Sequence, residues 1–286
     1  MDAATDASGR GDLVEINPSV PLLAGAPQMW RNLWTHRHLL SSFVQRDLRL
    51  RYRDTAFGYF WSLLEPLLLS GVYFLLYVIL AGSPQPRVPM WIIVGVITWQ
   101  LFSKTLTGTV TSLTKNDAII KQAYFPRELF AVTGAVAQLT LSSASLLVAI
   151  PFMIYFGIVP SLHLLLAPVG LLLAATLGLG IGLAFACLNV ANRDVEHLFK
   201  FLTRAGMFLS PVMWTIEMPK GRAQILDYLF FNPMATALTL VRNGIDGRPL
   251  GIHPGFVAYS VAVCALSLVV GATIFRRYEA GVVKRI

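Results

Sequence analysis

Long apolar segments separated by short polar ones form the main pattern of this 286-residue chain. Six apolar segments are long enough to cross a membrane core of about 30 Å as helices, at about 1.5 Å per residue. They lie at residues 57–81, 90–112, 129–157, 164–190, 201–217 and 255–275. The fifth is the least regular, because Arg204 lies near its start and Pro211 within it. The pattern predicts an all-α membrane protein with six transmembrane helices.

The segment before the first span has two distinct sides when it is drawn as a helix. Between Met29 and Asp54, apolar residues recur on one side, while Arg46, Arg49 and Arg53 fall on the other. Such an amphipathic helix lies along the membrane surface. We therefore predict an interface helix over residues 29–56; a simpler alternative is that these arginines only anchor the cytoplasmic side of the membrane.

The stretch from Gln45 to Pro66 marks the point where the chain enters the membrane. Arginines come first, then a cluster of aromatic residues, and then an uncharged run from Leu67 to Ala81. Cations favour the lipid headgroups and aromatic rings favour the interface. Residues 1–28 before the helix carry acidic residues among Pro, Gly and Ala, which predicts a flexible cytoplasmic tail rather than a cleaved signal peptide.

Composition and charge support a membrane protein. Mean hydropathy is +0.63 and only 13% of the residues are charged. Of the 23 Lys and Arg residues, we place seventeen in cytoplasmic segments, five outside and Lys104 within a span. This asymmetry predicts that both termini, including the tail 276–286, lie in the cytoplasm. The net charge of +8 thus indicates membrane orientation rather than nucleic-acid binding.

Two cytoplasmic loops have a composition that favours a docking role. Leu113–Glu128 and Asn192–Lys200 both mix charges with apolar residues and are compatible with helices. Exposed apolar side chains in such loops favour docking to another protein; the alternative is that they only join two spans. Outside, Ala223–Phe231 and Met234–Asn243 are two apolar segments too short to cross a bilayer, which predicts a re-entrant helical hairpin.

The sequence contains no motif that we recognise for catalysis, for a disulfide or for metal binding. Cys187 and Cys264 each stand alone in apolar runs, so the spacing predicts no disulfide or metal site. The sequence has no Asp-x-Asp motif of a sugar-nucleotide enzyme and no Gly-x-x-x-x-Gly-Lys-Ser/Thr loop for phosphates, so we predict no catalytic, cofactor-binding or metal-binding residues. An ion- or proton-coupled secondary transporter is the main alternative; it would be expected to contain inverted repeats, and none is evident.

Several stretches together resemble the membrane subunits of ABC-2 type exporters for O-antigen, teichoic acid and related lipid-linked polysaccharides, and more weakly those for actinobacterial galactan. The stretches are RDLRLRYRDTAFGYFWSLLEPLL (46–68), NDAIIKQAYFPRELF (116–130), NRDVEHLFKFL (192–202), Ser210-Pro211-Val212 and FNPMATALTLVRNGI (231–245). In this order they cover nearly everything after residue 30. The tail FRRYEAGVVKRI (275–286) departs from the usual ending of that family.

The resemblance implies an ABC-2 type transmembrane domain over residues 57–275, a homodimer, and two copies of a separate ATPase subunit that binds ATP and Mg. It places the complex in the inner (cytoplasmic) membrane of a bacterium, with a polyprenyl-pyrophosphate-linked glycan as cargo. It also implies that the interface helix and the loop 113–128 contact the ATPase. With the second loop, the expected coupling residues are Arg46, Arg49, Arg53, Lys115, Asn116, Asp117, Lys121, Arg193, Asp194 and Glu196.

Glycans stack on aromatic rings, so a sugar path should be lined with rings and few fixed charges. The candidate rings are Tyr59, Trp61, Tyr73, Tyr77, Trp91, Trp99, Phe208, Trp214, Phe230 and Phe231, although each ring alone could equally face lipid. Glu65 and Lys104 each lie roughly 12 Å deep in the first two spans. A lone charge at that depth is costly, so we predict an intramembrane ion pair; the alternative is that each side chain faces water or snorkels separately.

Overall fold

The structure is a computed structural model that describes residues 25–81, 86–122, 126–214 and 230–282. Within these ranges all regular secondary structure is helical, as predicted. Five helical segments are long and apolar enough to cross a membrane: Gly58–Ile79, Val88–Val110, Glu128–Tyr155, Leu162–Ala191 and Pro254–Glu279. They coincide with the first four predicted spans and the last.

The predicted span at 201–217 is not confirmed. Helix α10 (Asp194–Leu209) covers its first half and ends there, because Ser210 has extended backbone and precedes Pro211, which cannot continue a helix. Residues 215–229, including most of the predicted Ala223–Phe231 half of the hairpin, lie outside the described residues. The other half is helix α12 (Pro233–Asp246), which is capped by Asn232 at its start and by Gly247, with a φ of 68°, at its end.

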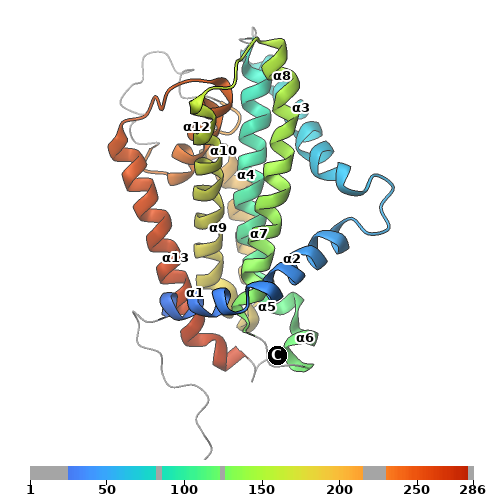
Figure 1. Cartoon of the computed structure of the whole chain (residues 1–286), viewed down its shortest axis with the longest axis vertical. Coiled ribbons are helices and arrows are strands. Elements are labelled where there is room, and N and C mark those ends of the chain that lie inside the picture. The colour runs from blue at the N-terminus through green and yellow to red at the C-terminus, as the bar shows by residue number, and fades with distance from the viewer. Residues whose placement is uncertain (1–24, 82–85, 123–125, 215–229, 283–286) are drawn as a thin grey trace, which may run out of the picture.

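The interface segment consists of two helices rather than the predicted single one. Helices α1 (Gly25–Thr35) and α2 (Arg37–Arg51) meet at His36, whose φ of −100° and ψ of 25° interrupt the helix. Met29 and Leu33 of α1 belong to the same core cluster as Phe275 near the chain end, whereas α2 has no buried residue. Figure 1 shows α1 lying across one end of the bundle and α2 leading away from it toward α3.

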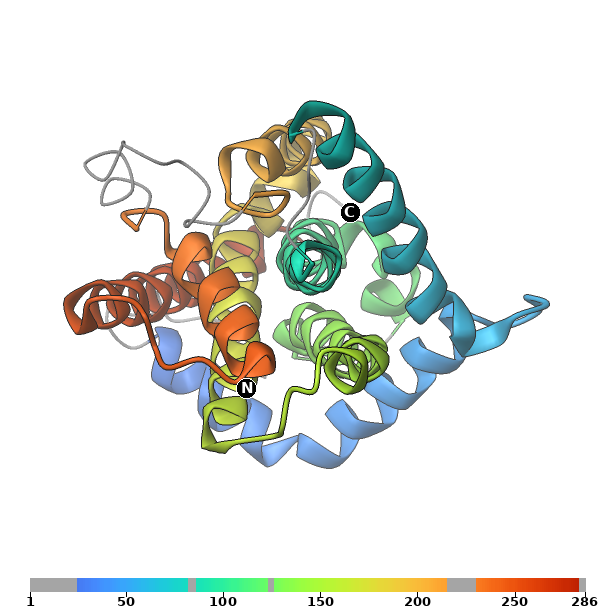
Figure 2. The ribbon, with the colours of Figure 1, turned by 90° about the horizontal axis from the view of Figure 1, so that it is seen from above.

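The spans divide into inner and outer helices. Helices α4 (Val88–Val110) and α9 (Leu166–Ala191, preceded by η3, Leu162–Leu165) are the most buried, with 78% and 61% of their most apolar windows inside the protein. Helix α7 (Glu128–Ser145) continues through η2 (Leu146–Val148) into α8 (Ala149–Tyr155). Seen from above in Figure 2, α4 lies at the centre and the other helices surround it.

The outer helices leave long apolar faces exposed. Helix α3 (Trp61–Ala81, preceded by η1, Gly58–Phe60) and helix α13 (Pro254–Val282) have only 11% and 22% of their windows buried. On α3, Leu68, Val72, Leu75 and Ile79 are all exposed. A face of this kind is covered either by lipid or by another protein chain.

Glycines bring the inner helix α9 into direct contact with its neighbours. A Cβ at Gly180 would lie 2.5 Å from the backbone of Ser267 in α13, and one at Gly178 would lie 2.8 Å from the Phe102 carbonyl of α4. Close approach of this kind is typical of helix packing in membranes, where small residues replace hydrophobic driving force. The short distances leave no space for a side chain.

Replacing Gly180 with Ala is therefore expected to lower the free energy of unfolding in detergent by about 1–3 kcal/mol, because α9 and α13 must separate. Gly134 of α7 is the matched control, since a Cβ there meets nothing within 4 Å. Gly134→Ala should be neutral or slightly stabilising, because Ala favours helix more than Gly does. Equal effects of both substitutions in a thermal unfolding assay would contradict the packing argument.

Candidate functional site

The predicted ion pair is brought together between the first two spans. The Lys104 Nζ of α4 lies 2.8 Å from both carboxylate oxygens of Glu65 in α3. The side chains are 39% and 52% exposed, so the pair lies at the surface of the single chain rather than in its core. Two half-exposed charges at this depth of a span require water or a second protein chain beside them, because lipid solvates them poorly.

A second polar contact connects α2 to the same region. Arg51 at the end of α2 binds Asp47 at 3.0 Å and donates to the Gln138 Oε1 of α7 at 2.8 Å. Arg51, Gln138 and Lys104 line one small cavity of about 30 Å³, room for about one water molecule. The pKa of the adjacent Tyr52 is raised, mainly because the ring is partly buried. Polar groups thus run continuously from α2 into the bundle.

The three predicted coupling arginines, two on α2 and one just after its end, share one surface. Arg46, Arg49 and Arg53 line a shallow hollow of about 560 Å³ together with Ser42, Gln45 and Leu50. Arg46 lies over the Phe43 ring, 5.4 Å from its centroid, and Arg53 lies 3.5 Å from Asp54. Such a surface binds anionic groups, which include both lipid phosphates and protein carboxylates.

The remaining predicted coupling residues lie on short helices. Lys115 ends α5 (Ser112–Lys115), Asn116 follows it, and Asp117 and Lys121 form an exposed pair at 3.9 Å in α6 (Asp117–Gln122). Figure 1 shows α5 and α6 at the same end of the bundle as α1.

The second predicted loop contributes the start of α10. Arg193 precedes the helix, and Asp194 and Glu196 lie in its first turn. The pKa of Glu196 is lowered, first by the hydrogen bond that Lys200 donates and also by the charge of Lys115. The end of α5 therefore lies near enough to the start of α10 for the charge of Lys115 to act on Glu196.

The aromatic candidates do not form one continuous lining. Trp91, Trp99 and Phe230 are buried, and Tyr73, Tyr77 and Trp214 are partly buried, so these rings mainly contact protein in this conformation. Tyr59 and Trp61 are exposed beside Tyr52 and Phe57 at the start of α3. Phe208 is exposed on α10, and Phe231 packs against Phe256 and Tyr259. The exposed rings thus belong to separate groups.

Two ionic networks were not predicted from the sequence. In the first, Asp246 of α12 accepts hydrogen bonds from Arg87 at 2.8 Å and from the Trp91 indole at 3.3 Å, and it pairs with Arg248 at 2.6 Å. Arg248 also lies over the Trp91 ring, 5.0 Å from its centroid. Arg242, one turn before Asp246 on α12, is also buried. In the sequence, the sign that could have pointed to this network is the i, i+4 spacing of these two charged residues in a short apolar segment.

The second network joins three helices at the end of the bundle that holds α1. Glu128, the first residue of α7, is fully buried, and its Oε1 accepts from the Asn32 side chain of α1 at 2.9 Å. Arg276 of α13 lies 3.5 Å from the same oxygen and 2.7 Å from Glu279. Arg127 donates to the Glu279 backbone carbonyl. The start of α7 is therefore fixed to α1 and α13.

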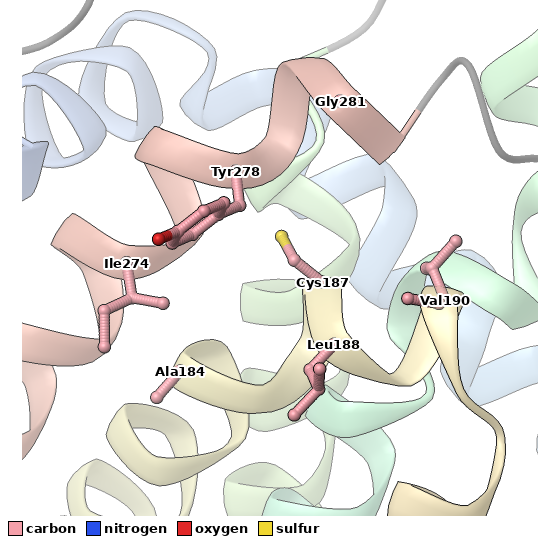
Figure 3. A pocket seen from close by; sticks show the side chains of 8 residues that line it. Ala184, Cys187, Leu188, Val190, Ile274, Tyr278 and Gly281 are labelled. Carbon is pink, nitrogen blue, oxygen red and sulfur yellow. The ribbon is translucent and has the colours of Figure 1, made fainter.

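One pocket, at the ends of two of the spans, is mainly apolar. A pocket of about 470 Å³ lies between the ends of α9 and α13 and is lined by Ala184, Cys187, Leu188, Val190, Ala191, Ile274, Tyr278 and Gly281. Figure 3 shows the Cys187 thiol and the Tyr278 ring facing this space from opposite helices. The lining offers hydrocarbon contact and no charged group, so it suits an apolar occupant rather than an ion.

Comparisons with known proteins agree with the sequence resemblance. The sequence model of the ABC-2 type transporter family matches residues 38–245. An O-antigen export system permease protein of Myxococcus xanthus is 28% identical over 213 residues, which cover 73% of this chain and 80% of the relative. A polysialic acid transport protein of Escherichia coli is 25% identical, covering 80% and 87%. A capsule polysaccharide export inner-membrane protein of Neisseria meningitidis is 22% identical, covering 88% and 96%.

Proposed function

The chain belongs to the ABC-2 type transporter family, and we propose that it is the transmembrane subunit of an ATP-driven exporter of a polyprenyl-pyrophosphate-linked polysaccharide. The observation that carries the cargo class is that the relatives named above are described as export or transport proteins for O-antigen, polysialic acid and capsule. All three are polysaccharides. An O-antigen, teichoic acid or galactan type of chain, moved from the cytoplasm outward, is the cargo we infer.

Energy for export comes, in this proposal, from a separate subunit. The sequence has no phosphate-binding Gly-x-x-x-x-Gly-Lys-Ser/Thr loop, so ATP and Mg are bound by a partner ATPase, present in two copies. The charged surfaces of α2, of α5 and α6, and of the start of α10 supply its docking site. The effect of the Lys115 charge on Glu196 supports a single site built from both segments.

A homodimer is supported by the charges on the surface of the single chain. The half-exposed Glu65, which pairs with Lys104 of α4, lies on the same helix as the uncovered apolar face of α3. A second copy placed near this face covers the apolar residues and provides a water-containing path beside the pair. The exposed rings Tyr59 and Trp61 at the start of α3 then flank the entrance of that path, where sugar rings can stack on them.

The proposal also includes the way the chain is arranged in the membrane. We infer six spans, an interface helix, a re-entrant outer hairpin that includes α12, and both termini in the cytoplasm of a bacterial inner membrane. An ion-coupled secondary transporter would use no partner and no ATP. The requirement for an ATPase subunit therefore distinguishes the two functions directly.

The test is export of the glycan by cells or proteoliposomes that contain the chain with or without its ATPase. Reversing the charge of Lys115, Asp117 or Lys121 is expected to weaken the complex by about ten-fold or more, or to uncouple hydrolysis from export, because like charges then meet in the interface. Reversal at Arg193, Asp194 or Glu196 should act in the same direction but more weakly.

Arg277→Glu is the matched control, since Arg277 is exposed on α13 and does not belong to the proposed docking site. Its complex should form normally. Export that continues without any ATPase, or normal complexes and normal export in all six reversals, would refute the proposed function or the docking site respectively.

A further inference from the structure

Arg242 binds four backbone carbonyls from two separate parts of the chain. Its Nε donates to the Trp91 carbonyl of α4 at 3.0 Å, and its Nη1 donates to the Trp214 carbonyl at 3.2 Å. The same guanidinium also donates to the carbonyls of Pro211 and Val212. Every hydrogen bond of its side chain within the described residues therefore goes to backbone oxygen.

Three of these acceptors, the carbonyls of Pro211, Val212 and Trp214, belong to the backbone just after the end of α10. The backbone from Ser210 to Trp214 is extended or turning, so its carbonyls are not bonded within a helix. A buried carbonyl without a partner is costly, and one guanidinium supplies donors to three of them. A second contact, from the Asn232 side chain to the Ser210 hydroxyl at 2.9 Å, holds the same break against the start of α12.

The helix that ends at this break is held loosely along its length. Only Val195, Phe199, Thr203 and Met207 of α10 are buried, one side chain per turn, while Phe201 and Phe208 are exposed. Its other end is fixed by the Asn189 side chain, which accepts from the Glu196 backbone N–H at 3.0 Å. A helix packed along one narrow stripe can shift as a rigid body with little repacking of the core, and the contacts at its two ends then carry the movement to its neighbours.

We propose that Arg242 is a positioning residue for export: it fixes the outer end of α10, so that α10 acts as a lever between the proposed ATPase-docking surface and the outer end of the bundle. The inference rests on the proposed function, because it assumes a motor at the cytoplasmic end. We call the Arg242 guanidinium with its four carbonyl acceptors the Arg242 clamp. Movement imposed near Glu196 then reaches the outer end of the bundle only while the hydrogen bonds of this clamp are intact.

The neighbouring α4 leaves space for this clamp. A Cβ at Gly95 would overlap the Arg242 Nη2 and would lie 2.8 Å from the Val212 carbonyl. Gly95→Ala therefore displaces the Arg242 guanidinium from its acceptors while leaving the arginine in the sequence. Gly108→Ala on the same helix is the matched control, because a Cβ there meets nothing within 4 Å.

The experiment measures ATP hydrolysed and glycan exported in the same proteoliposomes, which contain the full chain and its ATPase. ATP-dependent export by the unmodified complex tests the proposed function first. We then expect Arg242→Gln and Gly95→Ala to lower the glycan exported per ATP by about ten-fold, while hydrolysis stays within about two-fold, because the hydrogen bonds lost hold only the outer end. Gly108→Ala should export as much glycan per ATP as the unmodified complex. Arg242→Lys should give a ratio between that of Gly108→Ala and that of Arg242→Gln.

A covalent replacement of the clamp distinguishes positioning from general stability. The variant Ser210→Cys with Asn232→Cys is made in the Arg242→Gln background, where a disulfide between the two cysteines joins the end of α10 to the start of α12. Oxidation is expected to restore most of the glycan exported per ATP hydrolysed. Reduction of the disulfide should lower that ratio again. The proposal is overturned if Gly95→Ala and Arg242→Lys keep the normal ratio, if hydrolysis and export fall in parallel, or if the disulfide forms without restoring export.

Discussion

The double replacement Glu65→Gln with Lys104→Met is expected to regain most of the stability that either single replacement loses. The two oxygens of Glu65 both lie 2.8 Å from the Lys104 ammonium, so each charge is neutralised mainly by the other. Removing one leaves the other charge unpaired within a span, where the insertion cost of a charge is about 2.5–3.5 kcal/mol. Removing both eliminates that cost.

The measurement is a double-mutant cycle on thermal stability in detergent, with the single and double variants compared at one protein concentration. We expect a coupling energy above the roughly 1 kcal/mol of a surface ion pair, because the surroundings of the pair hold less water than bulk solvent. Asp117 and Lys121 form the control pair. They lie 3.9 Å apart and are about half exposed, so their coupling should be only about 0.3–0.5 kcal/mol.

Additive losses at Glu65 and Lys104 would show that each side chain is solvated separately, and would contradict the pair. The value of the coupling also reports on the path itself. A coupling as small as that of the control pair indicates a broad aqueous path beside α3, whereas a larger one indicates a narrow or closed path.

Hydrophobic pattern predicted most of the spans but not their ends. The second span was placed at 90–112, and the helix runs over Val88–Val110. The last was ended at residue 275, before Arg276 and Arg277, yet α13 continues to Val282. The apolar pattern ends at the first charged residues, Arg276 and Arg277, so the predicted span ended there. The helix continues past them, and Arg276 pairs with Glu128 and Glu279 instead of facing lipid.

Local pattern was also insufficient at the irregular positions. One interface helix was predicted, but His36 interrupts it, and no Pro or Gly marks that residue. The span at 201–217 was predicted from composition although Pro211 lies within it. The structure ends α10 before that proline, since extended backbone at Ser210 favours the end of a helix over a kink.

The candidate residues differ in how far the sequence could reveal them. Glu65 and Lys104 were predicted as partners from depth alone, because two consecutive spans joined by a short loop limit where their charges can meet. The partners of Arg242 and of Glu128 could not be predicted in this way. Glu128 and Arg276 are 148 residues apart, and neither lies in a pattern that points to the other. Only the packing of α1, α7 and α13 brings them together.

In the network that joins α1, α7 and α13, replacing Arg276 is expected to lower the free energy of unfolding more than replacing any other member. Its guanidinium lies between two carboxylates, Glu128 at 3.5 Å and Glu279 at 2.7 Å, and both carboxylates are nearly inaccessible to solvent. Replacing Arg276 with Met leaves two buried like charges without their shared cation. Breaking a buried ion pair from one side costs about 3–5 kcal/mol, because the remaining charge cannot return to water.

Glu128→Gln is the matched variant, and it should cost less. Arg276 then keeps Glu279, and the glutamine carbonyl can still accept from Asn32, so only one ionic contact is lost. We expect a loss of about 1–3 kcal/mol, typical of weakening one buried hydrogen-bonded group. The measurement is thermal unfolding in detergent for both variants. Equal losses would mean that Arg276 is not shared between the carboxylates, and that α7 and α13 are joined mainly by the apolar cluster around Phe275.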